Sequence, residues 1–182
     1  MDRALVDKEP SNPAKPDDVQ EPSGMGPTDN TPVIDSTLAA NPYTIEEVLE
    51  LPDGITLVHT GQSLCDSYPE TVEAGELSLP AAKGKKLLVL SFVINNSTEQ
   101  EQKVDLLSSK ATFRVTVNGS VSKSVLNTPL LDDLSTYYGT IPANSGVETV
   151  ILVEVGEEMA SGIESISINV KNDSKTYKAK LL

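Results

Sequence analysis

The sequence predicts an all-β domain, an antiparallel β-sandwich of about eight or nine strands. Three observations support this prediction. The apolar stretches have the length of strands, apolar and polar residues alternate within several of them, and turn residues separate them at short intervals. No long stretch repeats its apolar residues with the period of a helix. These features are typical of two sheets packed face to face.

The first 42 residues differ from the rest of the chain. They hold seven of the twelve prolines and eight acidic residues against three basic ones, with only scattered apolar positions. Such a segment buries too little apolar surface to offset the entropy cost of ordering it. We therefore expect a disordered, acidic, proline-rich tether over 1–42 and one sandwich domain over 43–182.

Composition excludes several classes of function. The 182 residues carry a formal net charge of −13, which repels phosphate backbones, so nucleic acid is not expected as a partner. Tryptophan is absent and aromatic residues make up 4%, which argues against surfaces that stack sugars or bases. The single cysteine, Cys65, excludes an internal disulfide and a cysteine-rich metal site.

The domain is predicted to begin with one short helix and a first strand. In TIEEVLEL, Thr44 and Glu47 have the spacing of a capping box, which predicts a short helix over 44–51 at the edge of the domain. The next residues, PDG, predict a turn, and the alternation over 55–60 predicts a half-buried strand. A weaker pattern predicts a short strand within 70–79.

The most apolar stretch predicts the central strand. KKLLVLSFVINN at 85–96 is far shorter than the roughly 20 residues of a membrane-spanning helix. A short buried helix is the alternative, because short apolar runs suit either structure. The even positions from Leu88 to Ile94 are all apolar and predict a core face, whereas Ser91 interrupts the smaller odd face. A second strongly apolar strand is predicted over 147–155, beside or opposite the first.

The middle of the domain predicts a hairpin. After a short edge strand at 104–107, residues 111–117 alternate and Asn118-Gly119 follows, a strong hairpin signal. We prefer a three-residue loop, which places Val117 opposite Val121. A two-residue loop would instead place two cationic residues opposite each other. Residues 128–139 predict a loop with one helical turn, and 138–141 a short strand.

The C terminus predicts a second hairpin. Pairing 163–171 with 174–181 across Asn172-Asp173 places Ile168 opposite Tyr177. The same register places Ser167 opposite Lys178 on the other face. Apolar residues then face apolar ones and polar residues face polar ones, which is typical of a sheet with one buried face.

The sequence offers few residues for catalysis or metal binding, and we predict no catalytic, cofactor or metal site. His59 is the only histidine, so a multi-histidine zinc site cannot form, and a partly exposed polar role is the simpler interpretation. Cys65 could act as a nucleophile with His59, but it has no flanking motif, which favours a free structural thiol. The acidic pairs Asp132-Asp133 and Glu157-Glu158 lack the spacing of a calcium loop and suit solvated surface charge.

Four asparagines stand in glycosylation sequons. The sequons matter only in a eukaryotic secretory host, and asparagine in turns explains them equally well. The residues are Asn95, Asn96, Asn118 and Asn172.

Several stretches together resemble a known family. GKKLLVLSFVINN, ATFRVTVNG, IPANSGVETVILVEV and the C-terminal IESISINVKNDSKTYKAKLL are similar in order and pattern to bacterial extracellular immunoglobulin-like domains of unknown function, which are related to a secreted immunoprotective antigen fold. The resemblance covers about 55–182 and implies an immunoglobulin-like β-sandwich on lipoproteins or secreted proteins of Gram-positive bacteria. It brings no catalytic signature and no established active site.

We therefore expect a monomeric, non-enzymatic binding or structural module with a protein partner and no cofactor. The resemblance implies a location at the cell surface or outside the cell, with the tether holding the domain away from a lipid anchor upstream of Met1. The chain as given starts without a signal peptide, lipobox or transmembrane segment. Two alternatives therefore stay open: a cytoplasmic accessory protein of a phage or mobile element, and a hydrolase that uses carboxylates or the Cys65/His59 pair.

Overall fold

The computed structural model describes residues 41–72 and 77–182. The predicted tether over 1–42 lies almost wholly outside the described residues, and its boundary with the domain stays a prediction. No helix within the described ranges is long and apolar enough to cross a membrane.

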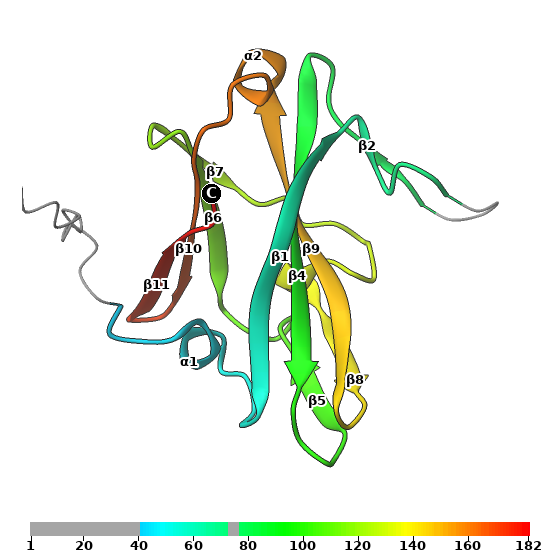
Figure 1. Ribbon diagram of the computed structural model, residues 1–182, viewed down its shortest axis with the longest axis vertical. Coiled ribbons are helices and arrows are strands. Elements are labelled where there is room, and N and C mark those ends of the chain that lie inside the picture. The colour runs from blue at the N-terminus through cyan, green and yellow to red at the C-terminus, as the bar shows by residue number, and fades with distance from the viewer. Residues whose placement is uncertain (1–40, 73–76) are drawn as a thin grey trace, which may run out of the picture. The chain divides into compact units, whose positions relative to one another are not determined.

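Two antiparallel sheets pack face to face and form the domain (Figure 1). The first has the strand order β1-β4-β9 and the second β11-β10-β6-β7, with two further pairs, β2-β3 and β5-β8. This arrangement confirms the predicted antiparallel β-sandwich. The elements are α1 (Ile45–Leu49), β1 (Ile55–Cys65), β2 (Ser67–Tyr68), β3 (Leu79–Pro80), β4 (Lys85–Asn96), β5 (Gln102–Asp105), β6 (Thr112–Val117), β7 (Val121–Ser124), the 3₁₀ turn η1 (Leu134–Thr136), β8 (Tyr138–Ile141), β9 (Ser145–Gly156), α2 (Glu157–Ala160), β10 (Ile166–Asn172) and β11 (Lys175–Lys180).

The main core fills the space between the two sheets. The even positions of β4 from Leu88 to Ile94 all lie in it, as predicted, and β4 is the middle strand of its sheet. Val115 of β6 and Ile168 of β10 belong to the same core from the second sheet. Burying side chains of this size stabilises the fold by roughly 1.5–3 kcal/mol each, before the entropy cost of ordering is subtracted.

The odd face of β4 carries a second, smaller core. Leu87 and Val89 pack there with Cys65, and β9 contributes Val150 and Leu152. Partly buried side chains from β2, from β3 and the residue after it, and from the segment after β7 cover this cluster: Tyr68, Leu79, Ala81, Leu126 and Leu130.

The helix α1 has the predicted capping box. The Thr44 hydroxyl accepts from the Glu47 backbone N–H at 3.2 Å, and the Glu47 carboxylate accepts from the Thr44 N–H at 2.7 Å. Val48 and Leu49 are buried against the sheets. The Asn172 side chain donates to the Val48 carbonyl at 3.0 Å and so joins the end of β10 to the helix.

The hairpin β6–β7 has the preferred three-residue loop. Val117 lies opposite Val121, which confirms the predicted register. Asn118 and Gly119 adopt φ angles of 51° and 64°, a region that asparagine and glycine tolerate best.

The register predicted for the C-terminal hairpin is wrong by two residues. Ile168 lies opposite Ala179, and Asn169 opposite Lys178. The cause is Asn172, which is buried by its bond to α1 and therefore belongs to β10 instead of the turn. The turn moves to Asp173 and Ser174, and because the shift is even, the same side chains still face the core.

The first strand is longer than predicted, since β1 runs to Cys65 instead of residue 60. A bulge between His59 and Gly61 breaks the alternation, so the pattern that revealed the first half of the strand does not continue into the second. Other differences are smaller. Of the strand expected within 70–79, the structure shows only Leu79, in the two-residue β3, and residues 73–76 lie outside the described residues. The edge strand expected at 104–107 is β5, which begins and ends two residues earlier, and α2 carries no prediction from the sequence.

Candidate functional site

His59 and Cys65, which could have formed a reactive pair, lie on opposite faces of the first sheet. His59 pairs with Phe92, whose side chain is in the main core, whereas Cys65 belongs to the second core. The bulge between them reverses the alternation of the strand. About 20 Å of strand also separates the two residues, at roughly 3.3 Å per residue. The structure therefore excludes the hypothesis that Cys65 and His59 act together as a catalytic pair.

The His59 imidazole packs on the Phe92 ring, with centroids 5.3 Å apart and a tilt of 59°. Its Nε2 is buried and has no hydrogen-bond partner among the described residues. Burial lowers the pKa of His59, and a backbone contact with Gly61 opposes this effect only in part. A lowered pKa favours the neutral ring, which suits an apolar neighbour.

Cys65 is a free thiol, 6% exposed. Burial is the main factor that raises its pKa, and the carboxylates of Glu70 and Asp66 act in the same direction. A raised pKa keeps the thiol protonated and weakly nucleophilic. The residue therefore serves the packing of the second core.

The acidic pair Asp132-Asp133 has two structural roles. Asp133 is 3% exposed, and its two oxygens accept four hydrogen bonds. The donors are the backbone N–H and hydroxyl of Thr128, at 2.9 and 2.7 Å, and those of Ser135, at 2.9 and 2.6 Å. Asp132 accepts from the Tyr68 hydroxyl at 2.7 Å. These bonds anchor the loop between β7 and β8.

The other acidic pair, Glu157-Glu158, lies exposed in the first turn of α2. Within residues 41–72 and 77–182, no group of three or more His, Cys, Asp or Glu side chains could hold a metal ion.

Three of the sequon asparagines hold the chain together through their side chains. Asn96 is 2% exposed, and its amide donates to the carbonyls of Gln100 and Ile141 at 2.7 and 3.1 Å. The Asn118 amide donates to Gly162 at 2.7 Å, and its oxygen accepts two backbone N–H groups just before β10. Asn172 is joined to α1 as described. These hydrogen bonds explain why asparagine stands at the three positions, so no glycan is needed to explain them.

A polar hollow of about 410 Å³ lies over Ser91, at the interruption of the odd face of β4. Asp132 and Glu148 line it, together with the hydroxyl of Tyr68. Burial, and secondarily the bond to Asp132, raises the pKa of Tyr68, so its hydroxyl stays a hydrogen-bond donor. Two carboxylates and a phenol hydroxyl therefore line this hollow.

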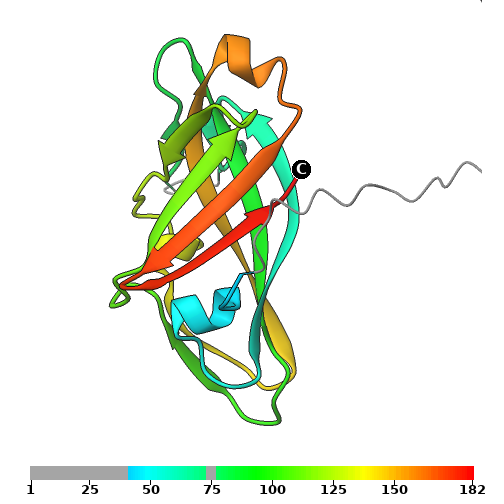
Figure 2. The ribbon, with the colours of Figure 1, turned by 90° about the vertical axis from the view of Figure 1, so that its left-hand side faces the viewer.

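The outer face of the second sheet is the strongest candidate for a contact surface. The inward positions of β6 and β10 lie in the main core, so the alternate positions point to solvent. We call these outward positions of β6, β7, β10 and β11 the cationic face, which Figure 2 shows turned toward the viewer. Its registered rows are Thr112, Lys171 and Thr176; Ser124, Arg114, Asn169 and Lys178; and Ser122, Thr116, Ser167 and Lys180.

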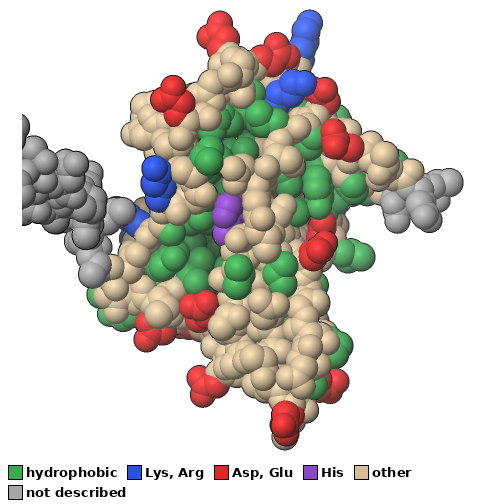
Figure 3. All heavy atoms as spheres, viewed as in Figure 1, with side chains coloured by type: hydrophobic (Ala, Val, Ile, Leu, Met, Phe, Trp, Pro, Cys, Tyr) green, Lys and Arg blue, Asp and Glu red, His purple; other side chains and the backbone are tan. Residues whose placement is uncertain are grey.

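The charges of this face are all positive. Arg114, Lys171, Lys178 and Lys180 are exposed, and no outward position of the four strands is Asp or Glu. In the view of Figure 3, acidic side chains lie at both ends of the domain, along its right side and at the upper and lower left, while cationic ones lie at the top and on the left margin. Among the described residues, the ion pairs lie elsewhere, between Lys85 and Glu154, Lys86 and Asp66, and Lys175 and Glu50.

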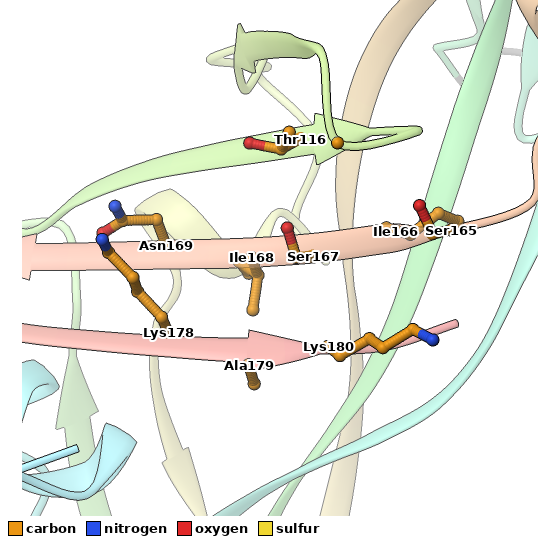
Figure 4. Close-up of a pocket in the computed structure, with 10 residues that line it drawn as sticks. Thr116, Ser165, Ile166, Ser167, Ile168, Asn169, Lys178, Ala179 and Lys180 are labelled. Atoms are coloured by element: carbon orange, nitrogen blue, oxygen red, sulfur yellow. The ribbon is translucent and has the colours of Figure 1, made fainter. Parts of the chain in front are cut away.

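A hollow of about 400 Å³ lies on the cationic face between β6, β10 and β11. In Figure 4 the Lys178 side chain crosses β10 toward Asn169, and Lys180 extends along the end of its strand. The hydroxyls of Thr116 and Ser167 lie between them. Ammonium groups, an amide and hydroxyls at one place can donate several hydrogen bonds to an anion.

Arg114 is held in place at the other side of the face. Its guanidinium donates to the hydroxyls of Ser122 and Ser124 at 3.1 and 3.2 Å, and both acceptors are neutral. The positive charge of Arg114 is therefore oriented by hydrogen bonds and is not neutralised by them.

The sequence predicted that β10 and β11 have a polar outer face, but it did not reveal the cationic face. Arg114 lies opposite Asn169 because β6 pairs with β10, two strands that are distant in the sequence. The alternation of polar residues in β6, β10 and β11 was a signal for a polar outer face. Only the pairing of these strands brings Arg114, Lys171, Lys178 and Lys180 together on it.

No protein-family model matches the chain, and no curated protein matches it. Solved structures are similar to it at low identity. An uncharacterized β-sandwich protein from Clostridium difficile has a TM-score of 0.49 at 16% identity, over 72% of this chain and 88% of its own. A candidate lipoprotein of Bacillus subtilis, ycdA, has a TM-score of 0.41 at 15% identity, over 71% of this chain and 36% of its own. A conserved hypothetical protein from Bacillus anthracis has a TM-score of 0.44 at 8% identity, over 72% of this chain and 89% of its own.

These structure neighbours come from Gram-positive bacteria, and the first is itself described as an uncharacterized β-sandwich protein. TM-scores below 0.5 are too low to transfer a function. The proposals below therefore rest on the residues of this chain.

Proposed function

We propose that this protein is a non-enzymatic binding module of the cell surface or the extracellular space, and that it contacts a protein partner through the cationic face. The observation that carries the proposal is a four-stranded sheet with Arg114, Lys171, Lys178 and Lys180 on its outer face and no carboxylate among them. The chain as a whole has a net charge of −13, so this face differs in sign from the protein that carries it.

Charge on a contact surface mainly sets which partner binds and how fast it associates. At physiological ionic strength, charges act over about 8 Å, so a partner that touches the face experiences its cations more than the distant acidic surface. A partner with an acidic surface is therefore attracted at this face.

The resemblance to Gram-positive extracellular immunoglobulin-like domains supports the proposed location. The acidic, proline-rich composition of residues 1–42 suits a segment that separates a domain from an anchoring point. Membership of that family and the tethered location belong to this proposal.

Photocross-linking in the native host tests the proposal. A photoreactive residue replaces Thr116, on the cationic face, or in a matched variant Thr56, on the outer face of the first sheet. We expect a distinct protein adduct from position 116 that position 56 does not give, and the protein in the surface or secreted fraction. Equal adducts from both positions, no adduct, or a purely cytosolic protein would contradict it.

A second candidate function has one specific observation in its favour. Asp132 and Glu148 line the hollow over Ser91, and paired carboxylates serve as acid and base in many hydrolases. Activity assays on glycoside and peptide substrates test this candidate. If the protein hydrolyses one of them, and if Asp132→Asn and Glu148→Gln each abolish the activity while the fold stays intact, catalysis replaces binding as the function.

A further inference from the structure

We infer that the segment recognised by the cationic face is an extended acidic peptide with carboxylates at alternate positions, lying along β11. The inference rests on the proposed function, because it names the chemistry of the partner at the same face.

The spacing of the lysines matches an extended chain. Lys178 and Lys180 project from the same side of β11, and residues two apart in a strand are separated by roughly 6.6–6.8 Å. An extended peptide places its own alternate side chains at that same interval. Two carboxylates at positions i and i+2 can therefore lie over the two lysine positions, and the flexible lysine side chains, which point apart in Figure 4, can turn toward them.

The rows across the sheet supply further donors. Asn169 lies directly opposite Lys178, and Ser167 directly opposite Lys180. Each lysine thus has a neutral donor about one strand spacing, roughly 4.8 Å, away. A carboxylate has two oxygens, so it can accept from an ammonium and from the neighbouring amide or hydroxyl at once.

The open edge of β11 is less suitable than its face. The Asn41 side chain accepts from the Lys178 N–H at 2.9 Å and donates to the Lys178 carbonyl at 2.6 Å. These two bonds occupy the backbone groups that a peptide added as a further strand would need. The peptide is therefore expected to contact side chains of the face instead of extending the sheet.

The absence of aromatic residues from the outward rows of the four strands argues against nucleobases and sugars as the bound groups. Bases and sugar rings are commonly held by stacking on aromatic side chains, and the outward rows carry only hydroxyl, amide and cationic side chains. Carboxylates on a peptide need no stacking surface.

Fluorescence anisotropy with labelled peptides and the full chain tests the inference. One peptide of about eight residues alternates Glu with Thr, which lets it span β11. A second has the same composition with its Glu residues in one block, and inorganic polyphosphate serves as a competing polyanion. The protein variants are Lys178→Glu/Lys180→Glu and, as a matched control, Lys83→Glu/Lys123→Glu, two exposed lysines outside the outward rows.

We expect the alternating peptide to bind the protein more tightly than the block peptide, and the Lys178→Glu/Lys180→Glu variant to bind it at least about tenfold more weakly. The control variant should change the affinity less than about twofold. Equal binding of the two peptides, preferential binding of polyphosphate, or equal losses in both variants would overturn the inference.

The two proposals fail in distinguishable ways. A protein adduct at position 116 without binding of the alternating peptide overturns the inference and leaves the proposed function standing. Neither an adduct nor peptide binding overturns both.

Discussion

The buried carboxylate of Asp133 provides the sharpest test of the structural roles assigned to the acidic pairs. Replacing Asp133 by Asn keeps the shape of the side chain but turns one acceptor oxygen into an NH₂ donor. That group would face either the N–H and O–H of Thr128 or those of Ser135, all now bound to the carboxylate. The backbone N–H on that side is therefore left without an acceptor, and the hydroxyl there has to turn and accept from the new NH₂ group.

The expected cost follows from these contacts. A hydrogen bond to a charged group contributes about 1.5–3 kcal/mol, so one lost bond and three bonds weakened by the loss of the charge give about 3–5 kcal/mol. Relaxation of the loop reduces this to about 3–4 kcal/mol, a large part of the roughly 5–15 kcal/mol that stabilises a typical domain. With a urea m-value of about 2 kcal/mol/M, the midpoint of unfolding should fall by about 1.5–2 M.

Urea unfolding followed by circular dichroism measures this shift. Glu158→Gln, which removes an exposed charge from α2, is the matched control and should change the free energy of unfolding by less than about 0.5 kcal/mol. If Asp133→Asn is as stable as the unmodified protein, or if calcium raises the stability of the unmodified protein but not of the variant, the structural role of Asp133 is refuted.

Three further outcomes can be measured on the same protein. Asn118→Ala removes three hydrogen bonds between the β6–β7 loop and residues 162–165 and places alanine at a φ of 51°, which strains the backbone. Thermal unfolding should show that the free energy of unfolding falls by about 2 kcal/mol, and an unchanged melting temperature would contradict this. The pKa of His59 lies below its ordinary value of 6.5 in the folded protein, so the unfolded chain binds the proton first as the pH falls. The free energy of unfolding should therefore fall as the pH drops through 6.5 toward the folded pKa. In urea titrations at pH values from about 7 to 5, His59→Gln should flatten this dependence. The raised pKa and burial of Cys65 predict that a thiol reagent modifies it slowly in the folded protein and rapidly in urea, and equal rates would show that the thiol is open to solvent.

Local patterns were sufficient for most of the individual elements. The capping box of α1, the apolar even face of β4 and the three-residue loop after Val117 depend on residues close together in the chain, and the structure confirms each. The sandwich itself follows from the number and alternation of such strands.

The errors arise where a distant contact decides the local structure. Asn172 suits a turn by its type, but its bond to Val48 draws it into β10 and shifts the hairpin. Gly61 marks a bulge that breaks the alternation of β1, so the second half of the strand has no periodic signal.

The candidate site depends still more on distant pairing. Ser91 was visible as an interruption of β4, but the Tyr68, Asp132 and Glu148 side chains above it come from three separate segments. The cationic face likewise exists only because β6 lies beside β10. A single sequence does not state which strands are neighbours.

The contact surface itself is the central claim, and photocross-linking from position 116 in charge-reversed proteins tests it most directly. The photoreactive residue is placed in the Lys178→Glu/Lys180→Glu protein and in the Lys83→Glu/Lys123→Glu protein, and both are expressed in the native host. We expect the protein adduct to disappear from the first and to persist in the second, because only the first removes cations from the cationic face. An adduct that persists in both, or disappears from both, would contradict the claim that this face binds the partner.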